Sequence, residues 1–168
     1  LATRLGLARA QASDPATIAT IEAAKNDLQA ALQELRSLAR GIHPAVLSQG
    51  GLRPALDVVV ESLPIEVDLD VPEDRFDAAL ETTAYYTVCE ALTNTVKHAG
   101  ATRARVRVRL TDDQLFIEVS DDGQGGASVQ ENGGLAGLDD RVRALGGELS
   151  VDSPQGGGTR LTASIPCA

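Results

Sequence analysis

The stretch Glu90-Ala-Leu-Thr-Asn94-Thr-Val-Lys97-His98 carries the most specific pattern in the chain. On a helix its polar residues fall on one stripe, because positions four and seven or eight apart share a face. A carboxylate, a carboxamide and a cation in one line suit a metal-bound phosphate, since Mg²⁺ prefers oxygen ligands and also takes phosphate oxygens. The alternative is a solvated outer face with an ordinary i,i+4 polar pair.

Three glycine-rich turns follow this stretch. The first begins at Asp121, contains Gly123 and Gly125, and comes directly after an alternating apolar pattern. An aspartate at the start of such a turn can accept a hydrogen bond from an exocyclic amine, while glycine lets the backbone approach a ligand without a Cβ in the way. The spacing matches neither the dinucleotide-binding fingerprint nor the P-loop. An acidic hairpin turn is the alternative.

The second turn, residues 133–137 (Gly-Gly-Leu-Ala-Gly), leads into a predicted helix. Free backbone N–H groups at a helix start bind phosphate well, and the alternative is a flexible loop with a helix cap. The third turn ends in Gly158-Thr159 before the last predicted strand, where a plain hairpin turn is the alternative. Each motif is weak by itself, but the order of all four is specific.

Apolar periodicity in the rest of the chain predicts its helices and strands. Helical spacing marks residues 52–63, 76–98 and 138–145, and strand alternation marks residues 65–71, 106–110, 115–119, 149–151 and 161–165. Runs of strands joined by hairpin-like turns, with the helices grouped, predict an α+β fold whose helices cover one face of the sheet.

The first forty residues differ from the rest and contain almost no glycine. A break at Asp14-Pro15 separates two predicted helices, with Asp14 as the N-cap. Apolar residues of the second helix recur every three or four positions, which indicates a narrow seam and favours a dimerising helical hairpin. One amphipathic helix packed on the same domain is the alternative. We therefore expect dimerisation helices over 1–40, a linker over 41–50 and a globular domain over 51–168.

Composition excludes several classes of protein. The net charge of −9 argues against nucleic-acid binding, which needs cationic side chains to displace phosphate counterions. No apolar run approaches the roughly 20 residues of a membrane span, and no leader-like segment is present. The two cysteines form no disulfide framework, which indicates a reducing compartment. We expect a cytoplasmic segment without membrane contact, although the parent protein can still be membrane-anchored.

The four motifs, taken in order, resemble the Bergerat-fold (GHKL-type) ATP-binding domain of histidine kinases, type II topoisomerases, MutL proteins and Hsp-type chaperones. The string Glu90-Ala-Leu-Thr-Asn94-Thr-Val-Lys97-His98-Ala is similar to the N box of the NarL/DesK-type sensor kinases, and residues 40–44 (Arg-Gly-Ile-His-Pro) resemble the linker of that subfamily. The resemblance covers essentially the whole chain. It implies an α/β sandwich, with a mixed sheet covered by helices on one face and preceded by a helical hairpin.

The resemblance also implies ATP and Mg²⁺ as ligands, with a role for each motif residue. Asn94 would coordinate Mg²⁺, Glu90 would orient a metal-bound water, and Asp121 would bind the adenine amine. The remaining expected nucleotide-binding residues are Lys97 and His98 near the phosphates, Gly123 and Gly125 at the pocket floor, Gly134, Leu135 and Gly137 at the phosphates, and Thr159 at the adenine end. Two positions depart from the family pattern, namely Asn132 where glycine is frequent and Asp122 where asparagine is frequent.

The phosphoacceptor of this subfamily lies in a His-Asp motif, and the chain contains no His-Asp pair. Residues 1–11 resemble the part of the first dimerisation helix just after that motif, so we expect a fragment that begins downstream of the acceptor. His43 lies in the linker without an acidic neighbour and is not expected to replace it.

The expected function is the ATP-binding catalytic region of a two-component sensor histidine kinase. The γ-phosphoryl group of Mg-ATP would pass to an upstream histidine and then to an aspartate of a response regulator, in a protein that is a homodimer when intact. This fragment alone is not expected to autophosphorylate. The alternatives are an anti-sigma-type serine kinase, and a dimerising module that has lost catalysis.

Overall fold

The computed structural model describes Asp14, Thr17 and residues 45–111, 113–127 and 134–167. The chain divides into two compact units, Leu1–Ile42 and His43–Ala168. In the first unit, Asp14 Oδ2 accepts hydrogen bonds from Thr17 N at 3.0 Å and from Thr17 Oγ1 at 2.8 Å. The bond from the backbone N–H is the one expected of an N-cap aspartate. The helical hairpin and its seam lie outside the described residues and stay predictions. Asn132, where the family frequently has glycine, also lies outside the described residues.

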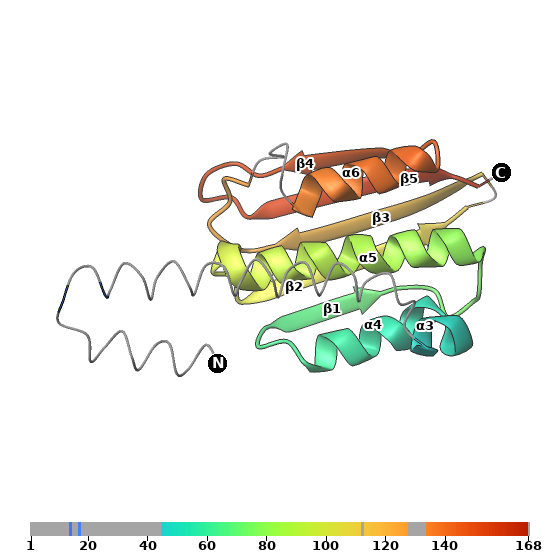
Figure 1. The fold of residues 1–168 in the computed structure, drawn as a ribbon, viewed down its shortest axis with the longest axis horizontal. Helices are drawn as coiled ribbons and strands as arrows, with labels where there is room; N and C mark the ends of the chain where they lie inside the picture. The colour runs from blue at the N-terminus through green and yellow to red at the C-terminus, as the bar shows by residue number, and fades with distance from the viewer. Residues whose placement is uncertain (1–13, 15–16, 18–44, 112, 128–133, 168) are drawn as a thin grey trace. The chain divides into compact units, whose positions relative to one another are not determined.

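The second unit is built on a five-stranded mixed sheet with the strand order β1-β2-β3-β5-β4 (Figure 1). Its strands are β1 (Glu66–Asp70), β2 (Arg103–Leu110), β3 (Gln114–Asp121), β4 (Glu148–Asp152) and β5 (Thr159–Pro166). β1 pairs with β2 in parallel, and the other three pairs are antiparallel. A parallel pair needs a long crossover between its strands, and helix α5 (Ala78–Asn94) supplies it here. The predicted strands are therefore confirmed.

Alternation along the central strands separates a core face from an open face. On β2, Ala104, Val106 and Val108 are buried, while the arginines between them point away from the core. These arginines pair with acids of the neighbouring strands, for example Arg105 with Asp68 at 2.8 Å. Opposite charges placed across two strands stabilise the pairing modestly. The open face therefore carries a series of ion pairs between neighbouring strands, with Phe116 of β3 also exposed on it.

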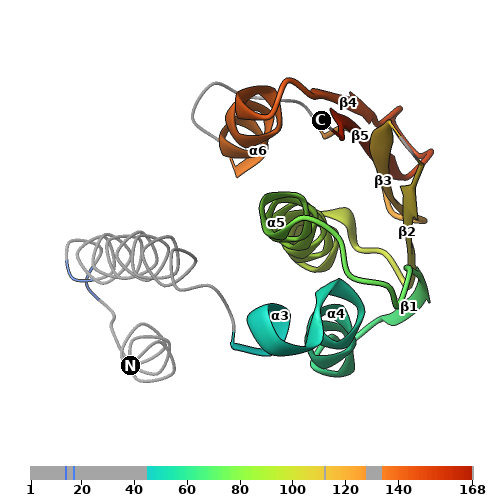
Figure 2. The ribbon, with the colours of Figure 1, turned by 90° about the vertical axis from the view of Figure 1, so that its right-hand side faces the viewer.

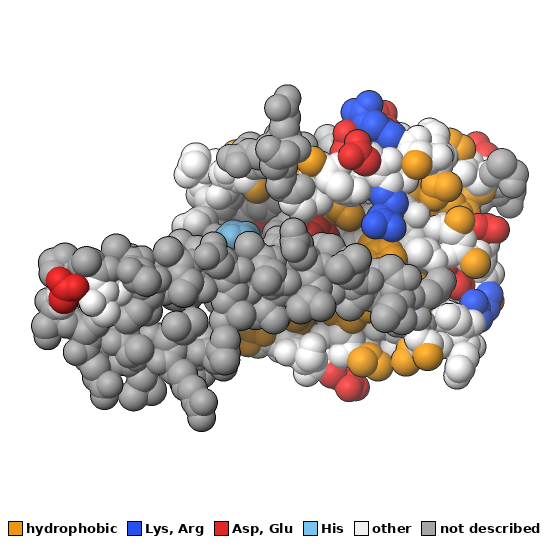
Figure 3. Space-filling model, viewed as in Figure 1, with side chains coloured by type: hydrophobic (Ala, Val, Ile, Leu, Met, Phe, Trp, Pro, Cys, Tyr) orange, Lys and Arg blue, Asp and Glu red, His pale blue; other side chains and the backbone are white. Residues whose placement is uncertain are grey.

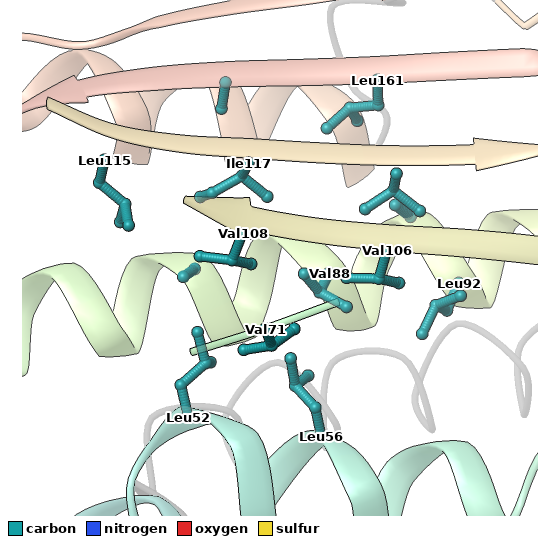
Figure 4. Close-up of a cluster of buried hydrophobic side chains, with 14 of the residues drawn as sticks. Leu52, Leu56, Val71, Val88, Leu92, Val106, Val108, Leu115, Ile117 and Leu161 are labelled. Atoms are coloured by element: carbon teal, nitrogen blue, oxygen red, sulfur yellow. The ribbon is translucent and has the colours of Figure 1, made fainter. Parts of the chain in front are cut away.

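All described helices of this unit lie on the other face of the sheet, as an end-on view shows (Figure 2). They are α3 (Ala45–Gly50), α4 (Leu52–Glu61), α5, the π-helical turn η1 (Thr95–Ala99) and α6 (Gly134–Ala144). The core forms between them and the sheet, where Val88 of α5 lies beside Val106 and Leu56 of α4 lies beside Val71 (Figure 4). Each fully buried aliphatic side chain of this kind contributes about 1.5–3 kcal/mol. The expected α+β fold with helices on one sheet face is confirmed.

The structure differs from the sequence-based expectation in two elements. Residues 45–50, expected in the linker, form α3, and Leu47 is completely buried. Six residues are too few to show helical periodicity, and the nearby Pro44, Gly50 and Gly51 favoured a linker. The helix expected over 76–98 is α-helical only to Asn94 and continues as η1.

The outer surface of the first two described helices is partly apolar. Hydrophobic side chains reach the surface over α3 and α4 (Figure 3), where Val46 and Val58 are exposed. Among the helices that the structure describes, none combines the length and hydrophobicity that crossing a bilayer requires.

Candidate functional site

A cavity of about 460 Å³ lies where the end of α5, the turn after β3 and the start of α6 meet β4 and β5. Its size falls within the range of small-molecule sites. The expected site residues on its wall are Asn94, His98, Asp121, Gly125, Gly134, Leu135 and Thr159. Segments more than sixty residues apart in sequence therefore meet at one concave surface.

Asp121 is the most firmly held side chain of the cavity. Its Oδ1 accepts hydrogen bonds from Gly123 N at 2.9 Å and from Thr159 N at 3.2 Å. Its Oδ2 lies 3.1 Å from Thr95 Oγ1, a hydroxyl that is also 3.0 Å from Ala91 O and has one hydrogen for both. A carboxylate has about four lone-pair sites. With three donors bound, Oδ2 keeps one acceptor position for a ligand.

The turn after β3 approaches the β4–β5 turn so closely that only glycine fits. Gly125 has a φ of 66°, and a Cβ placed on it would lie 2.0 Å from Pro154 O. Gly126 N donates to Ser153 O at 3.0 Å, which fixes the two turns to each other. Gly125 thus lies on the cavity wall where two turns meet, and its role in nucleotide binding stays a prediction.

The last residue of α5 and the π-helical turn η1 place Asn94 and His98, respectively, at the cavity wall. Gln124 holds the end of this turn, since its backbone N donates to Ala99 O and its Nε2 donates to His98 O, both at 2.9 Å. Single π-helical turns in α-helices occur frequently at functional sites. The turn ends at Gly100, whose φ of 61° lies in the left-handed region.

Helix α6 begins at the cavity with Gly134 and Leu135 on its wall. The first N–H groups of a helix lack intrahelical acceptors and carry the positive end of the helix dipole. A phosphate could therefore be bound there, as the sequence led us to expect. Glu90 lies next to this helix start but not on the cavity wall, and only 9% of it is exposed.

Three further expected site residues also lie off the cavity wall. Lys97 is exposed on η1, and Gly137 lies in the first turns of α6. Gly123 lies behind the wall, because a Cβ on it would approach Ala99 Cβ to 2.5 Å. Gly123 thus acts through close packing and through its N–H bond to Asp121, while the structure gives Lys97 and Gly137 no contact with the cavity.

Sequence reasoning missed the apolar wall of the cavity and two polar residues on it, Thr95 and Gln124. Val119, Val151 and Leu161 line it from three strands. Their inward direction follows from strand alternation, but the pairing that brings the strands together cannot be seen in one sequence. Gln124 stands inside the first glycine-rich turn, where its amide gave no signal of a bond to η1.

Asp122 follows Asp121 and takes a different role. Its carboxylate accepts hydrogen bonds from Arg103 N at 2.9 Å and from Thr102 N and Thr102 Oγ1, both at 2.8 Å. These bonds, with that from Arg103 N the strongest influence, hold the pKa of Asp122 below its usual value. Both backbone N–H groups donate to Asp122 Oδ1, so the single carbonyl oxygen of an asparagine side chain could accept the same two bonds.

The residues present fit a magnesium ion bound together with phosphate. Mg²⁺ is usually bound through one or two protein oxygens plus waters and phosphate oxygens. Asn94 offers a carboxamide on the cavity wall, near the start of α6. The described residues contain no group of three or more His, Cys, Asp or Glu side chains that could hold a metal ion. The donor set therefore suits an ion that arrives with a phosphate ligand.

Comparisons with known proteins give the same family. The family described as "Histidine kinase-, DNA gyrase B-, and HSP90-like ATPase" matches residues 79–168. The sensor histidine kinase NarS of Mycobacterium tuberculosis is 35% identical over 153 residues, which are 83% of this chain and 35% of NarS. The sensor histidine kinase LiaS of Bacillus subtilis is 26% identical over 161 residues, which are 92% of this chain and 45% of LiaS. The chain thus spans less than half the length of these relatives.

A solved histidine kinase domain from the blue-light activated histidine kinase EL346 of Erythrobacter litoralis has the same fold, with a TM-score of 0.60. The match covers 98% of this chain and 94% of that domain at 20% identity. Because the family model matches more than half of the chain and NarS is 35% identical to it, the chain belongs to the histidine kinase-, DNA gyrase B- and HSP90-like ATPase family. Its second unit is an ATP-binding catalytic domain of the histidine kinase type, as the resemblance in the sequence led us to expect.

Proposed function

We propose that this domain binds Mg-ATP in the cavity and presents its γ-phosphoryl group to a histidine of a two-component sensor kinase. An aspartate of a response regulator would then receive the group. The observation that carries the proposal is the geometry of Asp121, whose Oδ2 keeps an acceptor position at the cavity wall. An exocyclic adenine amine is a donor that fits this position.

The adenine ring would lie against the apolar side chains of Val119, Val151 and Leu161, which form one row across the sheet. Thr159 supports this end, because its N–H donates to Asp121 and its hydroxyl lies 2.9 Å from Ser153 Oγ. A guanine carries a carbonyl oxygen where adenine carries its amine, so an acceptor at Oδ2 would be left facing an acceptor. This cost favours adenine over guanine.

The phosphates would extend toward η1 and the start of α6. Backbone N–H groups of Gly134 and Leu135 would donate to them, and His98 lies on the same wall. Asn94, with Glu90 acting through a water molecule, would hold Mg²⁺, which neutralises phosphate charge when it is bound. Phosphoryl transfer depends mostly on such positioning and charge stabilisation. Glu90, Lys97 and Gly137 do not lie on the cavity wall, so their proposed roles rest on the resemblance in the sequence.

The kinase assignment rests on the named relatives and on the family, and dimerisation through residues 1–40 is part of the same proposal. We place the domain in the cytoplasm, where ATP is available. An extended protein that includes the upstream helix should form an acid-labile, base-stable phosphohistidine with radiolabelled Mg-ATP. Acid-stable label on serine would contradict the histidine kinase and favour the serine kinase.

The nucleotide site is tested first by Asp121→Asn. The variant places an amide where the adenine amine needs an acceptor, so calorimetric titration should show ATP binding about 10- to 100-fold weaker, as expected for a lost hydrogen bond to a charged group. Asp122→Asn is the matched control, because the same change at the neighbouring residue preserves its bonds to the Thr102–Arg103 backbone. Equal ATP affinity of Asp121→Asn and wild type would contradict the adenine assignment.

A further inference from the structure

Glu90 has a position that its expected role at the metal does not explain. It precedes Asn94 by one helical turn on α5, yet its carboxylate lies against the first residue of α6 and not on the cavity wall. We propose that the carboxylate of Glu90 competes with the phosphates of a bound nucleotide for the first turn of α6. This inference rests on the proposed function, since it requires that phosphates reach α6.

The contact between Glu90 and α6 is possible because Gly134 has no side chain. A Cβ on Gly134 would lie 1.9 Å from Glu90 Oε1 and 2.7 Å from its Cδ. The carboxylate thus occupies the space that any other residue at position 134 would fill. Glycine at this position serves the approach of Glu90 from the neighbouring helix, in addition to any approach of phosphate.

The first turn of α6 favours a negative charge that its own sequence does not provide. The helix has 11 residues and no acidic side chain in its first turn. Helices are stabilised when an anion lies near the free N–H groups of their first turn. The carboxylate of Glu90 lies beside Gly134 and would supply this charge from α5. A phosphate bound to the first N–H groups of α6 would meet this buried carboxylate of like charge.

A second contact keeps the two helices in register. The guanidinium of Arg141 on α6 lies over the ring of Tyr86, with 4.8 Å from its Cζ to the ring centroid. Tyr86, Glu90 and Asn94 follow one another at four-residue intervals, so they share one stripe of α5. Along this face of α5, Tyr86 contacts Arg141 of α6, Glu90 lies against Gly134 at the start of α6, and Asn94 lies on the cavity wall.

Competition predicts an affinity change that depends on phosphate and not on magnesium. Glu90→Gln retains the size and packing of the side chain but removes its charge. In EDTA, calorimetric titration of the variant should show ADP bound about two- to fivefold more tightly, the range expected for one charge at a helix start. Adenosine, which lacks phosphate, should bind as it does to the wild type. Glu61→Gln, on the exposed end of α4, is the charge-matched control and should change neither affinity.

The same titrations separate failure of this inference from failure of the proposed function. If wild type binds adenosine and ADP, but Glu90→Gln leaves the ADP affinity unchanged or weaker in EDTA, the competition is refuted and the nucleotide site stands. If wild type binds neither ligand, both proposals fall. The contact itself is measured by NMR, where the amide resonances of Gly134 and Leu135 should shift in Glu90→Gln and not in Glu61→Gln. Unchanged resonances in Glu90→Gln would also refute the proposal.

Discussion

Asp121 and Asp122 are neighbours with identical side chains, and the fold uses them for opposite purposes. The carboxylate of Asp121 accepts hydrogen bonds from three donors and keeps one acceptor position at the cavity wall. The carboxylate of Asp122 accepts hydrogen bonds from the backbone of Thr102 and Arg103 and so links this segment to the end of β3. The sequence pattern pointed to Asp121 as a ligand-binding residue through its place before the glycines, and the family resemblance gave it the adenine. It could not show the bonds of Asp122, because the partners lie some twenty residues earlier and meet it only after the strands pair.

Asp122 should make stability depend on acid pH. Its pKa is lowered in the folded protein, so its stabilising contribution is complete above the usual aspartate pKa of about 3.9 and disappears as the pH falls through the folded-state value. Asp122→Asn cannot titrate, so urea unfolding should show it less stable than wild type at pH 7, with the difference shrinking toward pH 3. Asp74→Asn, an exposed change of the same kind, is the control. A difference that is equal at both pH values would contradict this account.

At the scale of elements, long periodic segments could be predicted and short ones could not. The strands and α4, α5 and α6 follow from apolar spacing, although α6 begins at Gly134 and not at residue 138. Helix α3 was missed because its six residues follow a proline and end in glycine. The burial of Leu47 joins α3 to the core, and a contact from far along the chain adds to it, since Arg75 donates to Ser48 O at 3.4 Å while it pairs with Glu81.

Glu81 should therefore be important for stability although it lies outside the cavity. Only 1% of it is exposed, its two carboxylate oxygens bind Arg75 at 2.8 and 3.0 Å, and Phe76 N donates to it at 3.2 Å. Glu81→Ala removes these bonds and leaves a cavity, so urea unfolding should show a loss of about 2–4 kcal/mol.

The matched control for Glu81 breaks an exposed ion pair on α4. Asp57→Ala removes the pair with Arg53, whose Nε lies 3.0 Å from Asp57 Oδ1, and should cost under about 1 kcal/mol. If the two alanine variants lose similar stability, the buried pair does not anchor α3 in the way described.

At the scale of the whole molecule, the described core lies entirely within the second unit. Its buried hydrophobic side chains run from Leu47 to Ile165 and join helices to sheet in one cluster. The sequence predicted this organisation through the change in composition after residue 40, and the glycine-rich turns predicted which ends of the elements would face a ligand. It could not predict that the ends meet at a cavity, because the order β1-β2-β3-β5-β4 is set by pairing between distant strands.

A fragment of residues 43–168 should fold without the preceding unit, because a domain with its own core can be stable alone. We expect it to unfold cooperatively at the same urea midpoint as the second unit of the longer chain. Its affinity for ADP should be unchanged in calorimetric titration. A fragment that aggregates, lacks a cooperative transition or has lost ADP affinity would show that the second unit depends on residues outside it.

The π-helical turn η1 also restricts which insertions and deletions the gene can tolerate. A π-helical turn closes its hydrogen bonds over one residue more than an α-helical turn. Deleting one residue of Thr95–Ala99 could thus restore a regular α-helical turn, but it would leave the segment between Asn94 and Gly100 one residue shorter. Gln124 could then no longer donate to two carbonyls placed as those of Ala99 and His98 are. Insertions and deletions should therefore be tolerated in surface turns of the domain and should impair the protein when they fall at this end of the helix.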